Sequence, residues 1–359
     1  MAKERIQYFD ILKGVAIFLV VMGHVLTMCI REIDNAFLFK LIERVHMPIF
    51  FFISGYLTYK QADEYQFILP KLGKRAIQLL TPFVVVSMLW VMYYPHSGLH
   101  CPFNASLRDW LFSAYKLGYW FTPTLFLIIL FYCISVPILN RIKNDIVILL
   151  LVFVTMCIVN VGFGWASART GVKLSELFMI EPFVIFCPVF FVGVLANKNR
   201  VLLNKMLCNG RSITIALIVG SLLLYFSCYR WEFDVPSFFI IDSIECLLRN
   251  SLVVLVAIYI AKKWSDNVYS INPLGNRMSK IWTYMGRESL GIYLLHFFFL
   301  FPLSFLQQPM RDMGLGFVPC LVVSIVFAAA IVAVTLGVNY IISQSKLLSL
   351  LLTGKNQYR

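Results

Sequence analysis

DILKGVAIFLVVMGHVLTMCI, residues 10–30, is long and apolar enough to cross a bilayer, yet it carries Asp10, Lys13 and His24. At about 100° of rotation per residue, Lys13 and His24 lie on one helix face about three turns apart, with Asp10 within about 40° of that face. His24 therefore lies some 16 Å beyond Lys13, about halfway through a ~30 Å hydrocarbon core. Ionisable groups at that depth are costly. Function and packing against another helix explain them equally well from this helix alone.

The composition of the whole chain is that of a polytopic membrane protein. Its 359 residues are 60% apolar and 16% aromatic, and only 14% are charged, against about 25% in a soluble domain. No cleavage site of small residues follows the first apolar run, so we expect it to be retained. We predict an all-α protein with one membrane domain over residues 1–359, because no repeat or separate soluble domain is visible.

Apolar runs of near-spanning length predict about ten transmembrane helices. They cover residues 10–30, 46–60, 76–95, 119–139, 145–164, 176–196, 212–229, 241–261, 289–308 and 316–343. The second is short, with an alternative start near Ala36 and a break at Pro48. The stretch 103–118 has apolar residues at helical spacing, which is typical of a helix lying along the membrane interface.

The basic residues of the loops predict the orientation. Of the 31 lysines and arginines, 20 fall on the side of the N-terminus, nine on the other side and two within spans. The positive-inside rule then predicts both termini in the cytoplasm and an even number of crossings. The net charge of +13 is explained by this distribution, and we expect no nucleic-acid partner.

Other polar residues interrupt the apolar segments. RVHMPIFFFISGYLTYK, residues 44–60, contains His46 and the pair Ser54-Gly55, which helix packing alone would explain. Lys60, Lys71, Lys74 and Arg75 form a basic cluster. Such a cluster suits anionic lipid headgroups and a phosphate-bearing donor equally well.

Two later segments repeat this pattern. In the eighth span, the i, i+4 spacing of Glu245 and Arg249 predicts an ion pair with a structural role. In GRESLGIYLLHFFFL, residues 286–300, Tyr293 and His296 fall on one face with Ser289. The first and ninth spans thus both bring a histidine into the membrane. A proton-coupled transporter would use these histidines as relays, whereas an acyl-transferring enzyme would use one to activate a hydroxyl.

A resemblance separates these two classes. DILKGVAIFLVVMGH (10–24), HMPIFFFISGYL (46–57), KLGKRAIQLLTP (71–82) and residues 286–300 together resemble the membrane-bound acyltransferase 3 family. The similarity is greatest to members described as fucose 4-O-acetylase-like or intercellular-adhesin O-acyltransferases. It runs along nearly the whole chain.

The resemblance implies an acyl-CoA-dependent O-acetyltransferase of the bacterial inner membrane. It would move an acetyl or other short acyl group from cytosolic acyl-CoA across the membrane to a hydroxyl of a cell-surface or exported polysaccharide. A transporter or flippase for a glycan or lipid-linked intermediate is the alternative. The scattered histidines and cysteines have no metal-ligand spacing, so we expect no metal.

The resemblance also distributes roles among the residues. His24 is the general base or transient acyl carrier, and Lys13, Lys74 and Arg75 bind the donor. Lys13 stands where the family usually has arginine, and it keeps the charge without the bidentate fork. Asp10 is too far from His24 to orient it and is expected to pair with Lys13 or Arg5. The remaining assignments are His46, His296 and Ser54 as catalytic residues, and Asp10, Gly55, Tyr293, Trp120 and Glu181 as substrate-binding residues.

Overall fold

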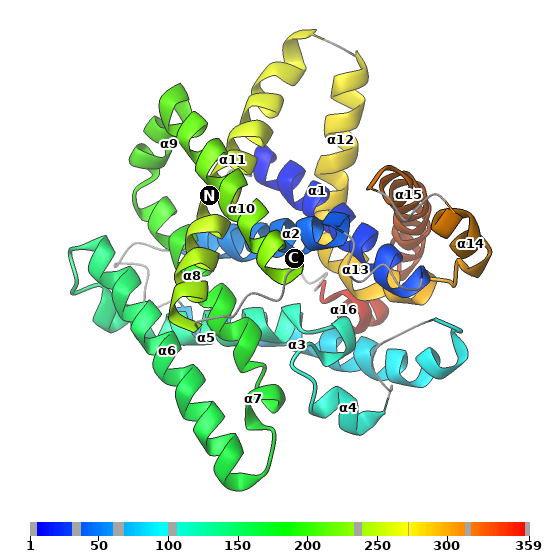
Figure 1. Cartoon of the computed structure of the whole chain (residues 1–359), viewed down its shortest axis with the longest axis horizontal. Coiled ribbons are helices and arrows are strands. Elements are labelled where there is room, and N and C mark those ends of the chain that lie inside the picture. The colour runs from blue at the N-terminus through cyan, green and yellow to red at the C-terminus, as the bar shows by residue number, and fades with distance from the viewer. Residues whose placement is uncertain are drawn as a thin grey trace.

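The computed structural model describes residues 6–30, 37–59, 68–99, 106–232, 239–271, 273–312 and 317–355. These ranges are overwhelmingly helical and contain no strand (Figure 1). Eight helices within them are long and apolar enough to cross a membrane. The chain is therefore an all-α, multi-pass membrane protein, as predicted.

Each of the ten predicted segments contains a helix. The eight long ones are α1 (Gln7–His24, continued by a π-helical turn, Val25–Cys29), α3 (Ile68–Tyr93), α5 (Phe121–Leu139), α6 (Asp145–Thr170), α8 (Ile180–Lys198), α10 (Gly210–Glu232), α11 (Phe239–Ile271) and α15 (Phe317–Ile342). The other two are α2 (Phe37–Thr58) and the short α13 (Ser289–Leu295). Shorter helices lie between them: α4 (Leu107–Leu111), α7 (Leu174–Leu177), α9 (Arg200–Cys208), α12 (Pro273–Arg287), α14 (Ser304–Asp312) and α16 (Lys346–Thr353).

Two predicted segments differ from the structure in their continuity. Helix α2 continues through Pro48 without interruption; the alternative start at Ala36 lies outside the described residues. The prediction of a single helix over the ninth span, 289–308, was wrong. Helix α13 ends at Leu295, and a 3₁₀ turn, His296–Phe299, follows it. Pro302 follows shortly after this turn and disfavours a helical conformation at Phe301, so the helix does not resume there.

Two further segments also differ. Only α4 and a 3₁₀ turn, Lys116–Gly118, are helical in the described part of the expected interface helix 103–118. The expected loop 262–288 is instead the end of α11 followed by α12, which form the tall helical pair in Figure 1.

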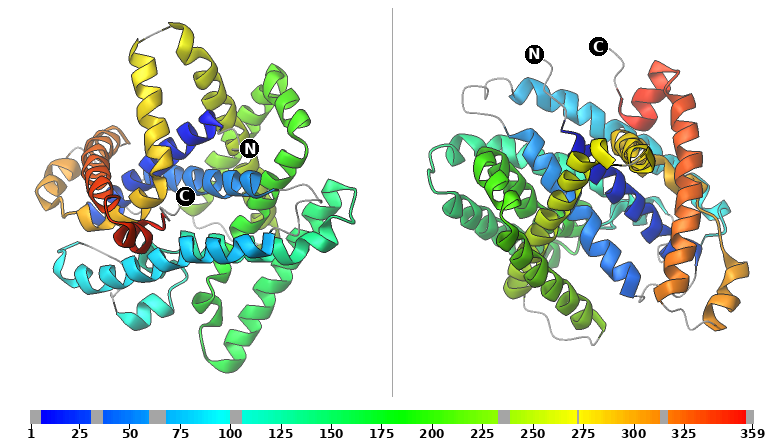
Figure 2. Two further views of the ribbon diagram at one scale, coloured as in Figure 1. Left: turned by 180° about the vertical axis from the view of Figure 1, so that it is seen from behind. Right: turned by 90° about the horizontal axis from the view of Figure 1, so that it is seen from above.

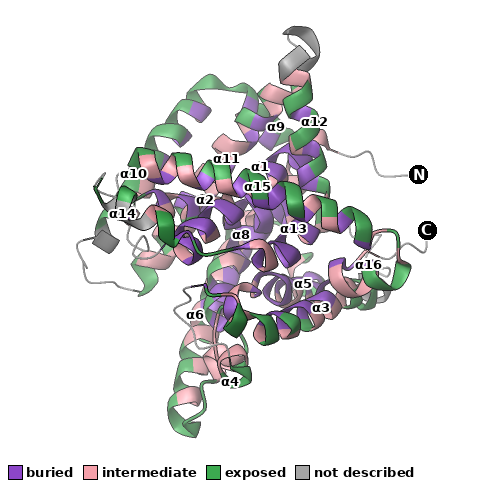
Figure 3. Cartoon of the chain, turned by 90° about the vertical axis from the view of Figure 1, so that its right-hand side faces the viewer, coloured by how far each residue is buried: buried purple, intermediate pink, exposed green. Residues whose placement is uncertain are grey.

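The buried core is built around α1, α2 and α8. Figure 3 shows buried residues concentrated on these helices and on α13, whereas α6 and α10 are largely exposed at the periphery. Exposed apolar side chains on those outer helices include Ile146, Leu150, Ile215 and Leu222. This pattern is the one expected where lipid tails cover the outer helices.

Helix α1 contacts α12 through its backbone (Figure 2). A Cβ atom on Gly14 would collide with the carbonyl of Trp282, and one on Gly286 would collide with the carbonyl of Asp10. The two glycines thus let the helices approach more closely than any side chain would allow.

Helices α2 and α8 meet in the same way. A Cβ atom on Gly55 would collide with the carbonyl of Phe190, and one on Gly193 would collide with the carbonyl of Phe52. The structure therefore gives Gly55 a packing role between these helices. We call the two contacts, Gly14 with Gly286 and Gly55 with Gly193, the glycine pairs.

Candidate active site

The first turns of α1 carry a buried carboxylate between two cations. Asp10 is 3% exposed. Its Oδ1 lies 2.8 Å from the Lys13 Nζ, and its Oδ2 lies 3.6 Å from the Arg287 Nε of α12. The expected Asp10–Lys13 pair is therefore present, with Arg287 as a second cation. The other expected partner, Arg5, lies outside the described residues.

This ionic cluster continues along the same side of the molecule to α3. Glu288 forms an ion pair with Lys355, just beyond α16. Gly354 packs against the carbonyl of Gln78 in α3, and the side chain of Gln78 accepts a hydrogen bond of 3.1 Å from Arg75. Arg75 and Gln78 of α3 therefore lie beside the segment that pairs with Glu288, the residue that follows Arg287.

The rest of the basic cluster is only partly described. Lys74 and Arg75 are both exposed on α3. Lys60 and the side chain of Lys71 lie outside the described residues. The structure thus leaves Lys74 and Arg75 accessible to a ligand approaching from this side.

The other end of α1 carries no such ion pair among the residues that the structure describes. His24 is the last residue of α1, and the π-helical turn follows it directly. Its ring stacks on His296 with centroids 5.2 Å apart and an interplanar angle of 29°. Phe297 contacts the same ring at 4.6 Å. His24 and His296, which are 272 positions apart in the sequence, thus stack on each other.

Backbone carbonyls fix the tautomers of the two other histidines. His46 Nδ1 donates to the Ile42 carbonyl at 2.6 Å, and His296 Nδ1 donates to the Ile292 carbonyl at 2.9 Å. Because a carbonyl only accepts, the Nε2 atom of each neutral ring is left as an acceptor. No hydrogen bond to His24 occurs within the described parts of the chain.

His24 and His46 line the same cavity, which has a volume of about 300 Å³. Tyr293 and Trp120 also line it, so four of the predicted site residues meet here. His296 is fully buried behind His24 and does not reach the cavity wall. The further lining residues are Val20, Gly23, Phe39, Glu43, Arg44, Met47, Pro48, Tyr115, Gly118, Ile185, Phe186, Cys246, Arg249 and Asn250.

A narrower apolar cavity of about 50 Å³ adjoins this one. The two share Val20, Met47 and Tyr293. The narrow cavity reaches Ile17, one turn from Lys13, and Ser289, two residues after Arg287. It therefore occupies the space between the ionic cluster and His24.

Tyr293 closes one wall of both cavities. Its hydroxyl donates to the Gly118 carbonyl at 2.9 Å and accepts from the Phe121 N–H at 3.1 Å. The loop that supplies Gly118 is strained, because Lys116 and Leu117 have φ values of 45° and 54°, which side chains seldom adopt.

Lys116 holds this strained loop in place. The residue is buried, and its Nζ donates to the carbonyls of Leu111 and Glu176. Burial lowers the pKa of Lys116 to about 8. The loop is thus tied to both α4 and α7, which fixes the position of Trp120 at the cavity wall.

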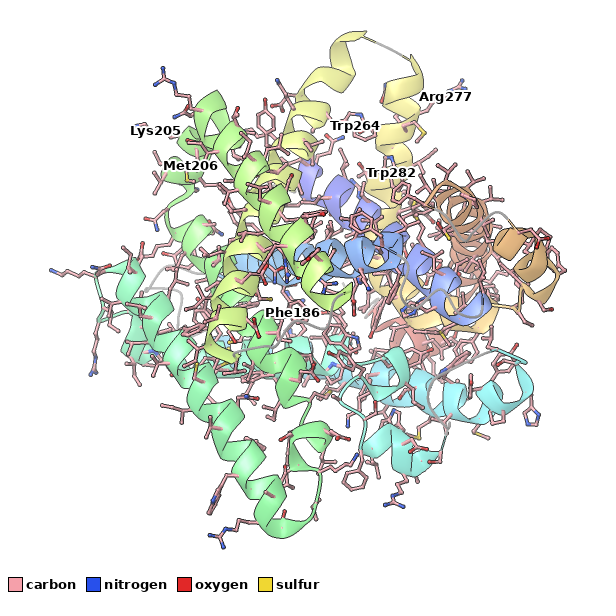
Figure 4. All side chains as sticks on the ribbon, in the orientation of Figure 1. Phe186, Lys205, Met206, Trp264, Arg277 and Trp282 are labelled. Atoms are coloured by element: carbon pink, nitrogen blue, oxygen red, sulfur yellow. The ribbon has the colours of Figure 1, made fainter. Side chains whose placement is uncertain are left out.

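The other predicted residues lie around the cavity or away from it. Trp120 stacks with Phe186 at 5.4 Å, and Figure 4 shows Phe186 near the centre of the molecule. Glu181 accepts a hydrogen bond of 3.0 Å from the Tyr115 hydroxyl. Ser54 and Gly55 do not line the cavity that contains His24.

Two residues of the cavity wall were not predicted to face it. The expected Glu245–Arg249 pair is present at 3.2 Å, but Arg249 also lines the cavity, together with Asn250. A single asparagine in an apolar helix is a weak sign of a binding site. Local spacing also does not show which other helices complete the cavity wall.

In the described ranges, no group of three or more His, Cys, Asp or Glu residues could hold a metal ion.

Comparison with known proteins identifies the family. The family model described as an acyltransferase domain, acyltransferase 3, matches residues 6–343. The chain belongs to the acyltransferase 3 family. Every residue of the two cavities and of the His24–His296 stack falls within this acyltransferase 3 match.

Two curated proteins are similar to part of the chain. Nodulation protein NolL of Sinorhizobium fredii (strain NBRC 101917 / NGR234) is 38% identical over 130 residues, which cover 33% of this chain and 34% of that protein. Nodulation protein NolL of Mesorhizobium japonicum (strain LMG 29417 / CECT 9101 / MAFF 303099) is 37% identical over 121 residues, 32% of this chain and 31% of that protein. The match thus spans about a third of these relatives. No solved structure matches.

Proposed function

We propose that the protein is an O-acyltransferase of the bacterial inner membrane. It takes an acetyl or other short acyl group from cytosolic acyl-CoA and transfers it to a hydroxyl of a cell-surface or exported polysaccharide. The observation that carries the proposal is the placement of His24 at a cavity whose narrow extension leads toward a cluster of cations. Family membership supports acyl transfer as the reaction class.

The cation side is the donor side in this proposal. Lys13 and Arg287, with Lys74 and Arg75 beyond them, would bind the phosphates of the CoA nucleotide. Lysine and arginine suit phosphate through charge-assisted hydrogen bonds. The excess of basic residues on this side favours a cytoplasmic location, where acyl-CoA is available.

The narrow cavity would mark the route of the pantetheine arm, and at about 50 Å³ it would have to widen to admit the arm. Its lining by Ile17, Leu290 and Phe121 is apolar, as a thin, largely uncharged chain requires. An arm lying there would bring the thioester toward Tyr293 and His24. The larger cavity would then receive the acceptor hydroxyl from the opposite side of the membrane.

His24 has two chemically balanced roles in this arrangement. As a general base it takes the proton of the acceptor hydroxyl while the oxygen bonds to the acyl carbon, the carbon–sulfur bond breaks and CoA leaves as the thiol. As a carrier its basic ring nitrogen first bonds the acyl carbon and CoA leaves as the thiolate; the acyl group then passes to the acceptor oxygen, whose proton goes to a second base and from there to the thiolate. His46 lies on the same cavity and is the candidate second base.

The experiment compares purified wild-type protein with the His24→Ala variant. The proteins are incubated with radiolabelled acetyl-CoA and methyl glycosides, and labelled ester and free CoA thiol are quantified. Ester formation by the wild-type protein and its loss in the variant support the proposal. Rapid quenching without acceptor separates the two roles, because only the carrier role leaves label on the wild-type protein.

The transporter alternative predicts a different result. It would move a glycan or lipid-linked intermediate without forming ester or releasing CoA thiol. A relay needs hydrogen-bonded groups, but His24 and His296 stack face to face. This contact fits the positioning of one histidine by another better than proton transfer between them.

A further inference from the structure

The wall of the His24 cavity formed by α11 contains two buried polar residues whose bonding is incomplete. Arg249 is 7% exposed and Asn250 is 2% exposed. Neither the Arg249 Nε nor the Asn250 Oδ1 has a hydrogen-bond partner among the described residues. Buried polar groups are nearly always hydrogen-bonded, because leaving one unsatisfied is destabilising. Both residues line the cavity, so a ligand group bound there is the candidate partner for these two atoms.

The rest of each side chain is fixed, so these two atoms have defined positions. The Asn250 Nδ2 donates to the Cys246 sulfur at 3.3 Å. One guanidinium nitrogen of Arg249 contacts both carboxylate oxygens of Glu245 at 3.2 Å. A donor N–H and an acceptor oxygen on consecutive residues are the complement of a hydroxyl group, which both donates and accepts.

An aromatic surface completes the same cavity. Trp120 and Phe186 stack with an interplanar angle of 23°, and both line the cavity. A sugar ring presents C–H groups on one face and hydroxyls around its edge. An aromatic face therefore suits the ring, while Asn250 and Arg249 suit its edge.

The charges of the wall favour a neutral sugar. Arg249 is paired with Glu245 at 3.2 Å. Arg44 lies 4.0 Å from Glu43 and donates to the Ser227 hydroxyl at 2.7 Å. Since each lining arginine already has a carboxylate nearby, a uronate or phosphate on the acceptor would gain little there and would be repelled by Glu43.

We propose that Asn250 and Arg249 form the acceptor-binding subsite, which holds a hydroxyl of a neutral hexose whose ring packs on Trp120. The hydroxyl that reacts is a neighbouring one on the same ring, directed at His24. A cavity of about 300 Å³ is at the small end of ligand pockets, so it takes one sugar ring of the polysaccharide. The subsite rests on the proposed acyltransferase function and names its substrate class.

The experiment measures acetyl transfer from acetyl-CoA to methyl glycosides of glucose, galactose and fucose, and to the corresponding methyl uronates. Asn250→Ala and Arg249→Lys each remove one unpartnered atom, and lysine keeps a charge beside Glu245. We expect each variant to raise the KM for the neutral glycoside about tenfold, the size of one lost hydrogen bond. The KM for acetyl-CoA and kcat should be unchanged. Ser251→Ala is the matched control, because in the described part of the chain the Ser251 hydroxyl bonds within its own helix, to the Leu247 carbonyl.

Deoxy glycosides test the same contact without relying on the fold of a variant. Removing the bound hydroxyl should raise the wild-type KM about tenfold and should have no further effect in Asn250→Ala, because the two deletions remove one interaction. Additive effects, an unchanged KM in Asn250→Ala, or a preference for uronates would overturn the subsite. If the wild-type protein acetylates no acceptor and releases no CoA, the proposed function fails instead.

Discussion

The two ends of α1 differ in how their polar residues are held. At the first end, Asp10, Lys13 and Arg287 form ion pairs across to α12. At the other end, His24 has no ion pair or hydrogen bond within the described ranges and is held by ring stacking on His296. Lys13 and His24 lie about three turns apart on α1. The first belongs to a cluster of ion pairs, whereas the second faces a cavity.

This difference corresponds to two kinds of work. A cluster of paired charges keeps its geometry and can still attract phosphates, because the two cations exceed the one carboxylate. A neutral histidine held only by stacking keeps one ring nitrogen free to take up a proton or an acyl group, and one N–H free to donate. A helix that only bound the donor, or only carried the catalytic residue, would not need both the ion-pair cluster and the stacked histidine.

Replacing His24 should have the largest effect on activity, because His24 is the proposed catalytic residue. His24→Ala should lower kcat/KM for acetyl transfer by about 10²–10⁴, the usual contribution of a general base, while acetyl-CoA still binds. Transfer is followed by labelled ester, and binding by calorimetry. His96→Ala is the matched control, because His96 lies exposed at the end of the turn after α3. Equal loss in both variants would remove His24 from the reaction.

His296 should position the His24 ring by packing against it. His296→Ala removes the stacked ring and should lower kcat by up to about 100-fold, since a small misplacement of a catalytic group has that effect. His296→Phe keeps an aromatic ring and should restore most of the rate. If phenylalanine is as damaging as alanine in steady-state assays, the His296 nitrogens take part in the chemistry.

Adding a single methyl group at the close contact between α1 and α12 should lower the stability of the protein. Gly286→Ala places a Cβ against the Asp10 carbonyl, and overpacking of this kind destabilises by about 1–3 kcal/mol. Thermal unfolding in detergent should show a lower Tm. Gly73→Ala is the control, because nothing lies within 4 Å of its added Cβ; an equal Tm for both variants would contradict the contact.

The donor end should show the smallest effect and the strongest salt dependence. Lys13→Ala should raise the KM for acetyl-CoA about tenfold with little change in kcat, because a charge-assisted contact to phosphate is lost. Lys13→Arg should retain binding. Lys205→Ala changes an exposed lysine on α9 (Figure 4) and should leave KM unaltered. An unchanged KM in Lys13→Ala would take Lys13 out of the donor site.

Local sequence spacing predicted most of the helices and the pairs within them. The Asp10–Lys13 and Glu245–Arg249 pairs follow from helix periodicity, because their members are three and four residues apart. Contacts between distant segments were not predictable in the same way. The His24–His296 stack, the Arg287 contact with Asp10 and the position of Asn250 depend on how helices pack, and no local pattern encodes that.

The end of the ninth span shows a second limit. An unbroken apolar run predicts a continuous helix, but the chain leaves the helix at His296. The Leu303 N–H then donates to the Cys29 carbonyl at 2.8 Å, so the two irregular segments satisfy each other. Irregular backbone within a membrane protein needs such a partner, and the partner is 274 residues away in the sequence.

The glycine pairs also determine which parts of the molecule can move. Backbone contact leaves α1 and α12 no room to slide past one another, and the same holds for α2 and α8. Between α1 and α2 the contact is looser, since a Cβ on Gly23 would meet the Ile42 side chain at an ordinary 3.5 Å. Helices α1 and α2 could therefore separate more easily than the helices of either glycine pair, and each carries one of the two cavity histidines, His24 on α1 and His46 on α2.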